Sequence, residues 1–303
     1  METVPETNSP ADIAEAPVLD PAEIAELRRV SVYLAETAAA HVRRRRPEVF
    51  GPGRTEDDSV RTKSTPTDPV TVVDTEAEQL IRSSLAETRP GERVLGEEGG
   101  GSLGAAGEIV WVVDPIDGTV NFVYGIPAYA VSVAAMRGGR SLAGAVVDVA
   151  GGVTYSAGLG AGATLAGGDE EPITLRCNDI DSVRLALVAT GFGYGAARRE
   201  RQGELVAQLL PKVRDIRRIG SAALDLCMVA AGRVDAHYEH GLNPWDWAAG
   251  ALIAAEAGAV LRLPGADSTG AQGELTVAAA AGIADELADL FDRLGVAAPI
   301  PEE

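Results

Sequence analysis

The chain has 303 residues, of which 46% are hydrophobic and only 4% aromatic, and 45 acidic against 26 basic side chains give it a net charge of −19. This length is enough for one large domain or two small ones, and the charge argues against a general binder of nucleic acid or anionic membrane, because phosphates would be repelled. No apolar run approaches the roughly 20 residues that cross a bilayer, and the acidic N-terminal segment shows no secretory pattern. Two cysteines, Cys177 and Cys227, cannot staple such a chain, so we expect free thiols and a cytoplasmic protein.

The chain begins with a segment poor in large apolar residues, 1–19, which we predict to be a disordered tail. A first helix is predicted to start at Asp20 as N-cap, with Pro21 in the first helical position and Glu23 three residues after the cap. We expect the run of arginines at 43–46 to end this helix as a solvated basic last turn, with a local anion or RNA contact as the alternative.

The second predicted helix has an apolar face from Val73 to Leu85 and is closed by Pro90 and Gly91. Short Val-rich runs then predict strands of an antiparallel or mixed meander at 109–114, 128–136, 142–148 and 152–157. From residue 172 strands and helices alternate, with strands expected at 185–190 and 214–219 and helices at 198–210, 221–231, 245–257 and 282–294. Gly-rich stretches at 99–107 and 264–273 are predicted to be loops. The pattern indicates an α+β fold of layered helices and sheets.

The most informative segment is IVWVVDPIDGTVNF, which starts at residue 109. A buried strand is predicted to deliver Asp114 at its C-terminal end, where open sheets place ligands, and Pro115 to end the ladder there. A tight turn would aim Asp114 and Asp117 at one point, and Thr119 would begin a helix whose free N–H groups can bind phosphate oxygens. Two carboxylates at that place would repel a phosphate unless a cation lay between them.

Taken alone, this segment has a plain alternative interpretation as a turn. Three further acidic loci favour a metal site: Glu97 and Glu98 in a Gly-flanked loop, Asp246 near the start of an Ala-rich helix, and Asp74 in the first turn of the second helix. Dipole compensation explains Asp74 or Asp246 singly, but together the four loci supply the oxygen ligands that Mg²⁺ prefers. The histidines lack the ligand spacing of a zinc site: His41, His237 and His240.

Four segments in order, K-S-x-P-x-D-x-V-T-x-x-D, G-E-E, WVVDPIDGTVNF and WDWAAGALIAAEAGAVL, resemble the inositol monophosphatase family, within the Mg²⁺-dependent, lithium-sensitive sugar and nucleotide phosphatases. The resemblance runs from about residue 22 to 297. It implies a layered αβαβα sandwich of the inositol monophosphatase and fructose-1,6-bisphosphatase type. The expected phosphatase domain spans 20–297, in two halves that meet between about 150 and 172, followed by a tail at 298–303. Such proteins are usually homodimers, and the apolar segments 142–157 and 174–190 are candidate interfaces.

The resemblance also implies roles for individual residues. Glu97, Asp114 and the carbonyl of Ile116 would hold a first Mg²⁺. Asp114, Asp117 and Asp246 would hold a second, and Glu97 would face a third, more weakly bound ion. Thr119, hydrogen-bonded toward Glu97, would orient the attacking water with Asp74 in support, and the amides of Gly118 and Thr119 would bind the phosphate. Substrate contacts are expected from Asp246, Glu239 and the turn Gly220-Ser221-Ala222, and Lys63 and Asp68 fall in a mobile loop expected to close over the site.

We therefore expect Mg²⁺-dependent hydrolysis of a small polyol phosphomonoester, most simply inositol 1-phosphate, by in-line attack of a metal-activated water. Fructose-1,6-bisphosphatase, histidinol-phosphate phosphatase and phosphoadenosine nucleotidase remain alternatives, and the aromatic residues within 191–195 leave the sugar specificity open. A different class, a regulatory binding protein on a phosphatase fold that uses the basic run 43–46, is a further alternative. Beyond the substrate and a second copy of the chain, no nucleic acid or membrane partner is expected.

Overall fold

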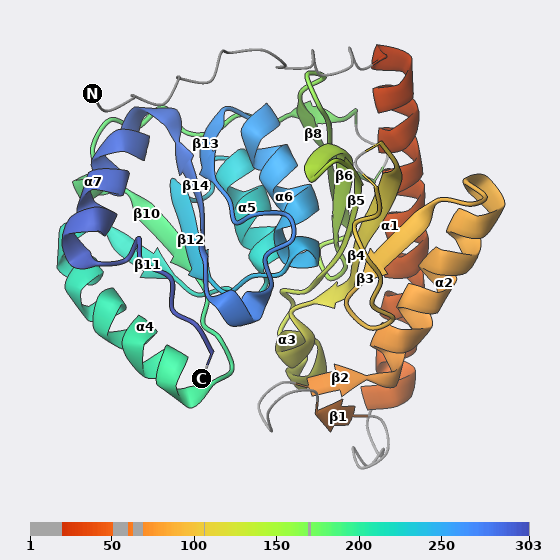
Figure 1. Cartoon of the computed structure of the whole chain (residues 1–303), viewed down its shortest axis with the longest axis horizontal. Helices are drawn as coiled ribbons and strands as arrows, with labels where there is room; N and C mark the ends of the chain where they lie inside the picture. Colours follow the sequence, from red (N-terminus) through yellow and green to blue (C-terminus); the bar gives the residue numbers. More distant parts are fainter. Residues whose placement is uncertain (1–19, 51–59, 63–68, 106, 169–170, 303) are drawn as a thin grey trace, which may run out of the picture.

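The computed structural model describes residues 20–50, 60–62, 69–105, 107–168 and 171–302. Figure 1 shows five layers: two helices, a sheet, two helices, a second sheet and two outer helices. The layered αβαβα arrangement predicted from the sequence is therefore confirmed. The predicted tail 1–19 lies outside the described residues.

The larger sheet has seven strands in the order β3-β4-β5-β6-β7-β8-β9. Its strands are β3 (Arg93–Gly96), β4 (Ile109–Asp117), β5 (Ala130–Arg137), β6 (Arg140–Asp148), β7 (Val153–Gly158), β8 (Ala163–Gly167) and β9 (Ile173–Thr174). β3 pairs with β4 in parallel and every later neighbour is antiparallel, so the predicted mixed meander is confirmed. β3, β8 and β9 extend the sheet beyond the four strands that the Val-rich runs predicted.

The second sheet has five strands in the order β11-β10-β12-β14-β13. They are β10 (Leu187–Thr190), β11 (Asp215–Arg217), β12 (Ala236–His240), β13 (Ala259–Arg262) and β14 (Leu275–Ala280). The sequence predicted β10 and β11 but not the other three, whose alanines and histidines have weak strand preference. β12 and β14 are largely buried between helix layers, which favours the strand conformation despite weak propensity, whereas β13 is an edge strand that pairs only with β14 among the described strands.

Helices occupy the three other layers. α1 (Pro21–Phe50) and α2 (Val72–Thr88) cover the outer face of the seven-stranded sheet, α5 (Ala222–Ala230) and α6 (Pro244–Glu256) lie between the sheets, and α4 (Ala196–Leu209) and α7 (Ala284–Leu294) lie outermost on the other side. Shorter elements are α3 (Thr119–Tyr124), the strand pair β1 (Val60–Thr62) and β2 (Pro69–Thr71), and the 3₁₀ turns Val183–Leu185, Leu210–Lys212, Gly270–Gln272 and Ala281–Ile283. No helix of the described residues is both long and apolar enough to cross a membrane.

The first helix starts as predicted, since the Asp20 carboxylate accepts a hydrogen bond from the amide of Ala22 at 2.9 Å. The prediction that the arginine run ends it is wrong, because the helix continues through Pro47 to Phe50. The arginines bind neighbouring groups instead: Arg45 pairs with Glu76 on α2, and Arg46 donates to the Phe122 carbonyl. These contacts fix the last turns of the helix against the body of the protein.

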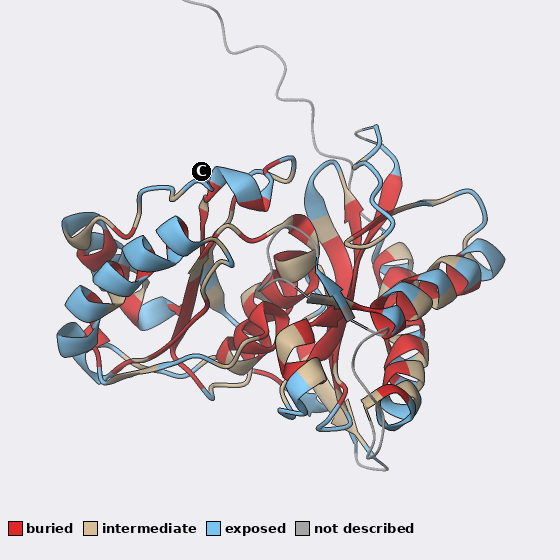
Figure 2. Cartoon of the chain, turned by 90° about the horizontal axis from the view of Figure 1, so that it is seen from below, coloured by how far each residue is buried: buried red, intermediate tan, exposed pale blue. Residues whose placement is uncertain are grey.

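Separate apolar clusters fill the spaces between neighbouring layers of the described residues. One apolar cluster joins the inner helices to strands of both sheets, and a second joins α1 and α2 to the seven-stranded sheet. Figure 2 shows buried residues concentrated on the sheets and inner helices, with exposed outer faces on the outermost helices. The segment 142–157, a candidate interface from the sequence, lies largely in this core within β6 and β7, and its exposed part is the turn at 150–152.

Candidate active site

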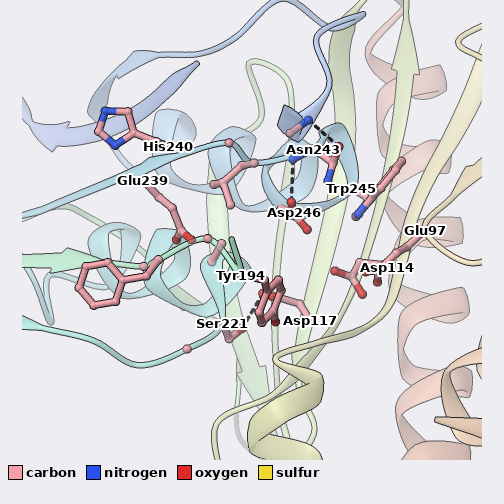
Figure 3. A pocket seen from close by; sticks show the side chains of 18 of the residues that line it. Glu97, Asp114, Asp117, Tyr194, Ser221, Glu239, His240, Asn243, Trp245 and Asp246 are labelled. Carbon is pink, nitrogen blue, oxygen red and sulfur yellow. Dashed lines mark hydrogen bonds between the residues drawn. The ribbon is translucent and has the colours of Figure 1, made fainter. Parts of the chain in front are cut away.

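A pocket of about 360 Å³ opens between the two sheets, beside the ends of the central strands. Carboxyl groups from separate elements line it, and Figure 3 shows several of them turned toward one space. They are Glu97, Asp114, Asp117, Asp225, Glu239, Asp246 and Glu302. The structure thus brings together the predicted metal ligands Glu97 and Asp246, which are 149 residues apart in the sequence, and Ile116, Thr119, Ser221 and Ala222 lie at the same pocket.

Asp114 and Asp117 reach the pocket through an irregularity in β4. The strand was expected to end at Asp114, but its pairing resumes at Asp117 after a shift in register. Pro115 has no N–H to donate to the ladder, so the chain bulges there and then rejoins the sheet. Asp114 Oδ1 accepts the Ile116 amide at 3.0 Å, which fixes the turn between the two aspartates.

Gly118 lies between Asp117 and α3 and has a φ of +94°, a conformation that favours glycine. A Cβ at this position would stand 3.0 Å from the carbonyl oxygens of Ala128 and Gly220. The first N–H groups of α3 have no partner within the helix, and Thr119 at the start of this helix lines the pocket.

The loop that carries Glu97 is held by a residue that the sequence analysis missed. Glu78, on the buried face of α2, accepts hydrogen bonds from the amides of Glu98 and Gly99, each at 2.8 Å. Arg82 pairs with the same carboxylate at 2.8 Å. Asp74 and Glu78 are four residues apart on an otherwise apolar helix face, and that spacing was the signal available in the sequence.

Asp246 occupies the first turn of α6, as predicted. Its Oδ2 accepts the amide of Asn243 at 2.7 Å, and the two residues form a capping box. The Asn243 side chain in turn accepts the amide of Gly270 at 2.8 Å. The helix start therefore orients Asp246 toward the pocket.

Asp117 is bound by the start of α5. Ser221 Oγ donates to Asp117 Oδ2 at 2.6 Å, and the amide of Ala223 donates to the same oxygen at 2.6 Å. The turn Gly220-Ser221-Ala222, expected to contact substrate, thus also holds a predicted metal ligand. The N-terminal dipole of the helix favours a negative charge there.

The Thr119 hydroxyl lies 3.2 Å from Asp74 Oδ1 and 3.0 Å from the Ile116 carbonyl oxygen. Asp74 is in the first turn of α2, so this contact links the starts of α2 and α3. The expected hydrogen bond of Thr119 toward Glu97 stays a prediction. Lys63 and Asp68, expected in a closing loop, lie outside the described residues.

The acids perturb one another strongly. Burial, followed by the charge of Glu97, raises the pKa of Asp114 and of Asp246 well above the ordinary range. Burial also raises the pKa of Asp117 to about 6, where the bonds from Ser221 and Ala223 oppose it, and that of Asp74 to about 7. So many buried carboxyl groups in one place need protons or cations to compensate them.

The donor chemistry fits a hard, oxygen-preferring divalent cation. Among the residues that the structure describes, no group of three His, Cys, Asp or Glu side chains is yet arranged to hold a metal ion. Both cysteines are free, as expected, and neither lines the pocket.

This fold, with buried acids and helix starts converging between two sheets, defines a phosphatase of the layered αβαβα class. The description "Inositol monophosphatase family" belongs to a family model that matches residues 23–295, and the chain belongs to that family.

Relatives of known sequence or structure match this chain over most of its length. The inositol-1-monophosphatase SuhB of Mycobacterium tuberculosis is 58% identical over 287 residues, which cover 92% of this chain and 98% of the relative. A solved structure titled Mycobacterium tuberculosis SuhB matches with a TM-score of 0.75 at 54% identity, over 89% of this chain and 97% of that one. The Thermotoga maritima IMPase structure matches with a TM-score of 0.75 at 28% identity, covering 88% and 97%.

Proposed function

We propose that the protein hydrolyses inositol 1-phosphate to inositol and phosphate in a Mg²⁺-dependent reaction. The observation that carries the proposal is the convergence of Glu97, Asp114, Asp117 and Asp246 on one pocket beside the start of α3. The relatives named inositol-1-monophosphatase support the substrate class.

In this proposal the family's metal positions map onto the pocket acids. Glu97, Asp114 and the Ile116 carbonyl would hold one Mg²⁺. A second Mg²⁺ would be held by Asp114, Asp117 and Asp246, and Glu97 would also face a third ion. When bound, the ions lower the pKa of a water and neutralise charge on the transferring phosphoryl group.

The protein's own groups position the reactants. The Thr119 hydroxyl, fixed by Asp74, orients the attacking water, and the amides of Gly118 and Thr119 bind phosphate oxygens. Asp74, with its pKa raised to about 7, can hold or release a proton near neutrality. Positioning of this kind supplies much of the rate enhancement in phosphoryl transfer.

The polyol is proposed to lie against the second sheet. Glu239, at the end of β12, lines the pocket beside Ser221 and Ala222, and burial raises the pKa of its carboxyl to about 8 while the Arg218 charge opposes that rise. A protonated carboxyl group can donate and accept hydrogen bonds, which suits a ring of hydroxyls. Asp246 completes the contacts to the sugar.

A panel of phosphate esters tests the substrate. Phosphate release would be measured with Mg²⁺ and with a chelator, using inositol 1-phosphate, fructose 1,6-bisphosphate, histidinol phosphate and phosphoadenosine phosphate. We expect Mg²⁺-dependent turnover with inositol 1-phosphate as the best substrate. If another ester were the best substrate, the proposed substrate would change and the proposed chemistry would stay. If no ester released phosphate, the proposed function would be refuted.

A regulatory binding role is the second candidate, because relatives of another name also match. The "Nus factor SuhB" of Vibrio cholerae is 41% identical over 193 residues, covering 63% of this chain and 70% of the relative. The basic run, however, is engaged within the protein: Arg43 donates to the Val149 carbonyl, Arg44 to His41, and Arg45 pairs with Glu76 and Glu48. A pull-down that survives Asp114→Asn would favour a partner role independent of catalysis.

Homodimeric assembly, lithium sensitivity and a cytoplasmic location follow from the family resemblance and the free cysteines, and we include them in the proposal. Sedimentation equilibrium tests the dimer, a Li⁺ titration of phosphate release tests the inhibition, and cell fractionation tests the location. A monomer at micromolar concentration would refute the first of these.

A further inference from the structure

The end of the described chain is packed against the mouth of the pocket. Residues 298–303 were expected to form a tail, and the family model ends at residue 295. In the structure His240 Nε2 and the Val296 carbonyl lie 2.8 Å apart, the Ile300 amide donates to the Gly273 carbonyl at 2.9 Å, and the Glu302 amide donates to the Ala271 carbonyl at 2.8 Å. We call residues 296–302 the C-terminal segment.

Gly273 makes this packing possible. It has a φ of +70°, and a Cβ at this position would stand 1.9 Å from the Ile300 carbonyl oxygen. Every other amino acid would therefore force the C-terminal segment away from this loop. The Arg262 side chain adds a hydrogen bond to the Ala297 carbonyl at 3.3 Å.

The C-terminal segment brings Glu302 to a buried cation. Arg198 on α4 is 3% exposed, and its Nη2 donates to the carbonyls of Gly270 and Ala271 at 2.8 and 3.1 Å. Its Nη1 lies 3.7 Å from Glu302 Oε1, and its buried Nε has no hydrogen-bond partner. Arg198 and Glu302 both line the pocket that holds the acidic cluster.

Carbonyl groups solvate a guanidinium but do not neutralise its charge, so Glu302 supplies the compensating charge at the pocket mouth. Arg218, the other arginine lining the pocket, faces Glu239, whose pKa its charge lowers. Without Glu302, the Arg198 guanidinium would be open to a second anionic group on a substrate. With Glu302 in place, such a group meets a carboxylate of the same sign.

We propose that Arg198 and Glu302 form a specificity element in which Glu302 neutralises Arg198 and so disfavours substrates that carry a second phosphate. The element rests on the proposed function and deepens it, because it selects a phosphomonoester of a neutral polyol over a bisphosphate. The Glu302 carboxylate repels a second phosphate group at the mouth of the pocket and takes no part in the chemical step.

The test compares Glu302→Gln with the wild type on inositol 1-phosphate and fructose 1,6-bisphosphate. We expect the ratio of kcat/KM for the bisphosphate to that for the monophosphate to rise about two- to fivefold, the range for removing one partly exposed charge interaction. The change should appear in KM for the bisphosphate, with kcat unchanged. Glu302→Lys should raise the ratio further, and adding Arg198→Met to Glu302→Gln should remove the gain.

Glu204→Gln is the matched control, since Glu204 pairs with Arg201 on the same helix as Arg198 and does not line the pocket. It should leave the ratio at the wild-type value. An unchanged ratio in both Glu302 variants would overturn the proposal. A purely structural role of the C-terminal segment would instead lower kcat/KM for both esters equally, which would also overturn it.

A binding measurement separates this proposal from the proposed function. If the wild type hydrolyses neither ester, the proposed inositol 1-phosphatase activity fails, and calorimetric titration with fructose 1,6-bisphosphate then decides the role of Glu302. Tighter binding to Glu302→Gln than to the wild type would support the specificity element, and equal binding would refute it.

Discussion

The Thr119 hydroxyl lies 3.2 Å from Asp74 Oδ1, although the two residues are 45 positions apart in the chain. This contact joins the first turn of α2 to the first turn of α3. Asp74 cannot rotate freely, because its Oδ2 also accepts the amide and the hydroxyl of Thr71 at 3.0 and 2.5 Å. The hydroxyl proposed to orient the attacking water is thus fixed by a separate helix.

We predict that Thr119→Val lowers kcat about 100-fold, the cost of losing one positioned hydrogen-bonding group, while Thr119→Ser keeps activity within a few fold. The rise in Tm on adding Mg²⁺ should be unchanged in both variants, because no metal ligand is altered. Thr88→Val, near the exposed end of α2, is the control. Equal activity of the valine variant and the wild type would contradict the role of Thr119.

Because the acids in the pocket are crowded, we predict that removing one of them stabilises the protein without metal and weakens its function. Asp246→Asn removes one half-buried carboxyl from the pocket, whose pKa is raised by desolvation and by the Glu97 charge. We expect Tm in chelator to rise by a few degrees, and the further rise on adding Mg²⁺ to shrink. Asp289→Asn on the exposed face of α7 should change neither value, and a lower Tm for Asp246→Asn in chelator would count against this explanation.

Glu78 is predicted to act on the metal site through the loop that carries Glu97. Glu78→Ala removes the acceptor of the Glu98 and Gly99 amides, so it should lower the free energy of unfolding by about 1–3 kcal/mol. It should also raise the Mg²⁺ concentration needed for half-maximal phosphate release. Glu87→Ala, at an exposed position of the same helix, provides the comparison, and an unchanged Mg²⁺ requirement in Glu78→Ala would refute the link.

We predict that buried His237 contributes to the loss of protein stability at acidic pH. Burial lowers its pKa from 6.5 to about 3, and its ring nitrogens lie 3.8 Å from Asp225 Oδ2 and 4.0 Å from Glu239 Oε2. Burial raises the pKa of both carboxyls, so they offer the ring little negative charge. Between pH 6.5 and 3 the unfolded chain binds the extra proton, so stability is present above about 6.5 and is lost as pH falls.

His237→Gln should therefore lose less stability than the wild type over that window. Denaturant unfolding at a series of pH values measures this, with the slope of the free energy of unfolding against pH as the readout. Parallel slopes in the two proteins between pH 6.5 and 3 would show that His237 is protonated in the fold.

Much of the site was predictable because its residues lie at points where the sequence marks element ends. Asp114 follows a Val-rich run, and Asp246 follows the N-cap and proline pattern of a helix start, so local chemistry predicted both positions. The strand β12, which carries Glu239, has no such local signal, and it is a strand because the helices and β14 bury it.

The contacts that hold the site were harder to predict, since they join distant parts of the chain. Glu78 reaches the Glu97 loop, Ser221 reaches Asp117 across 104 positions, and Glu302 reaches Arg198. Each depends on how the layers stack, which periodicity within one element does not specify. The contact between Thr119 and Asp74 likewise joins residues of two different helices.

The most direct test is phosphate release from inositol 1-phosphate by the wild type and Asp114→Asn, each with Mg²⁺ and with chelator. We predict turnover by the wild type only with Mg²⁺, and a loss of at least about 10²- to 10³-fold in Asp114→Asn, by analogy with the removal of one electrostatic stabiliser. Turnover that persists in chelator, or an Asp114→Asn variant as active as the wild type, would contradict the proposed metal-assisted phosphatase.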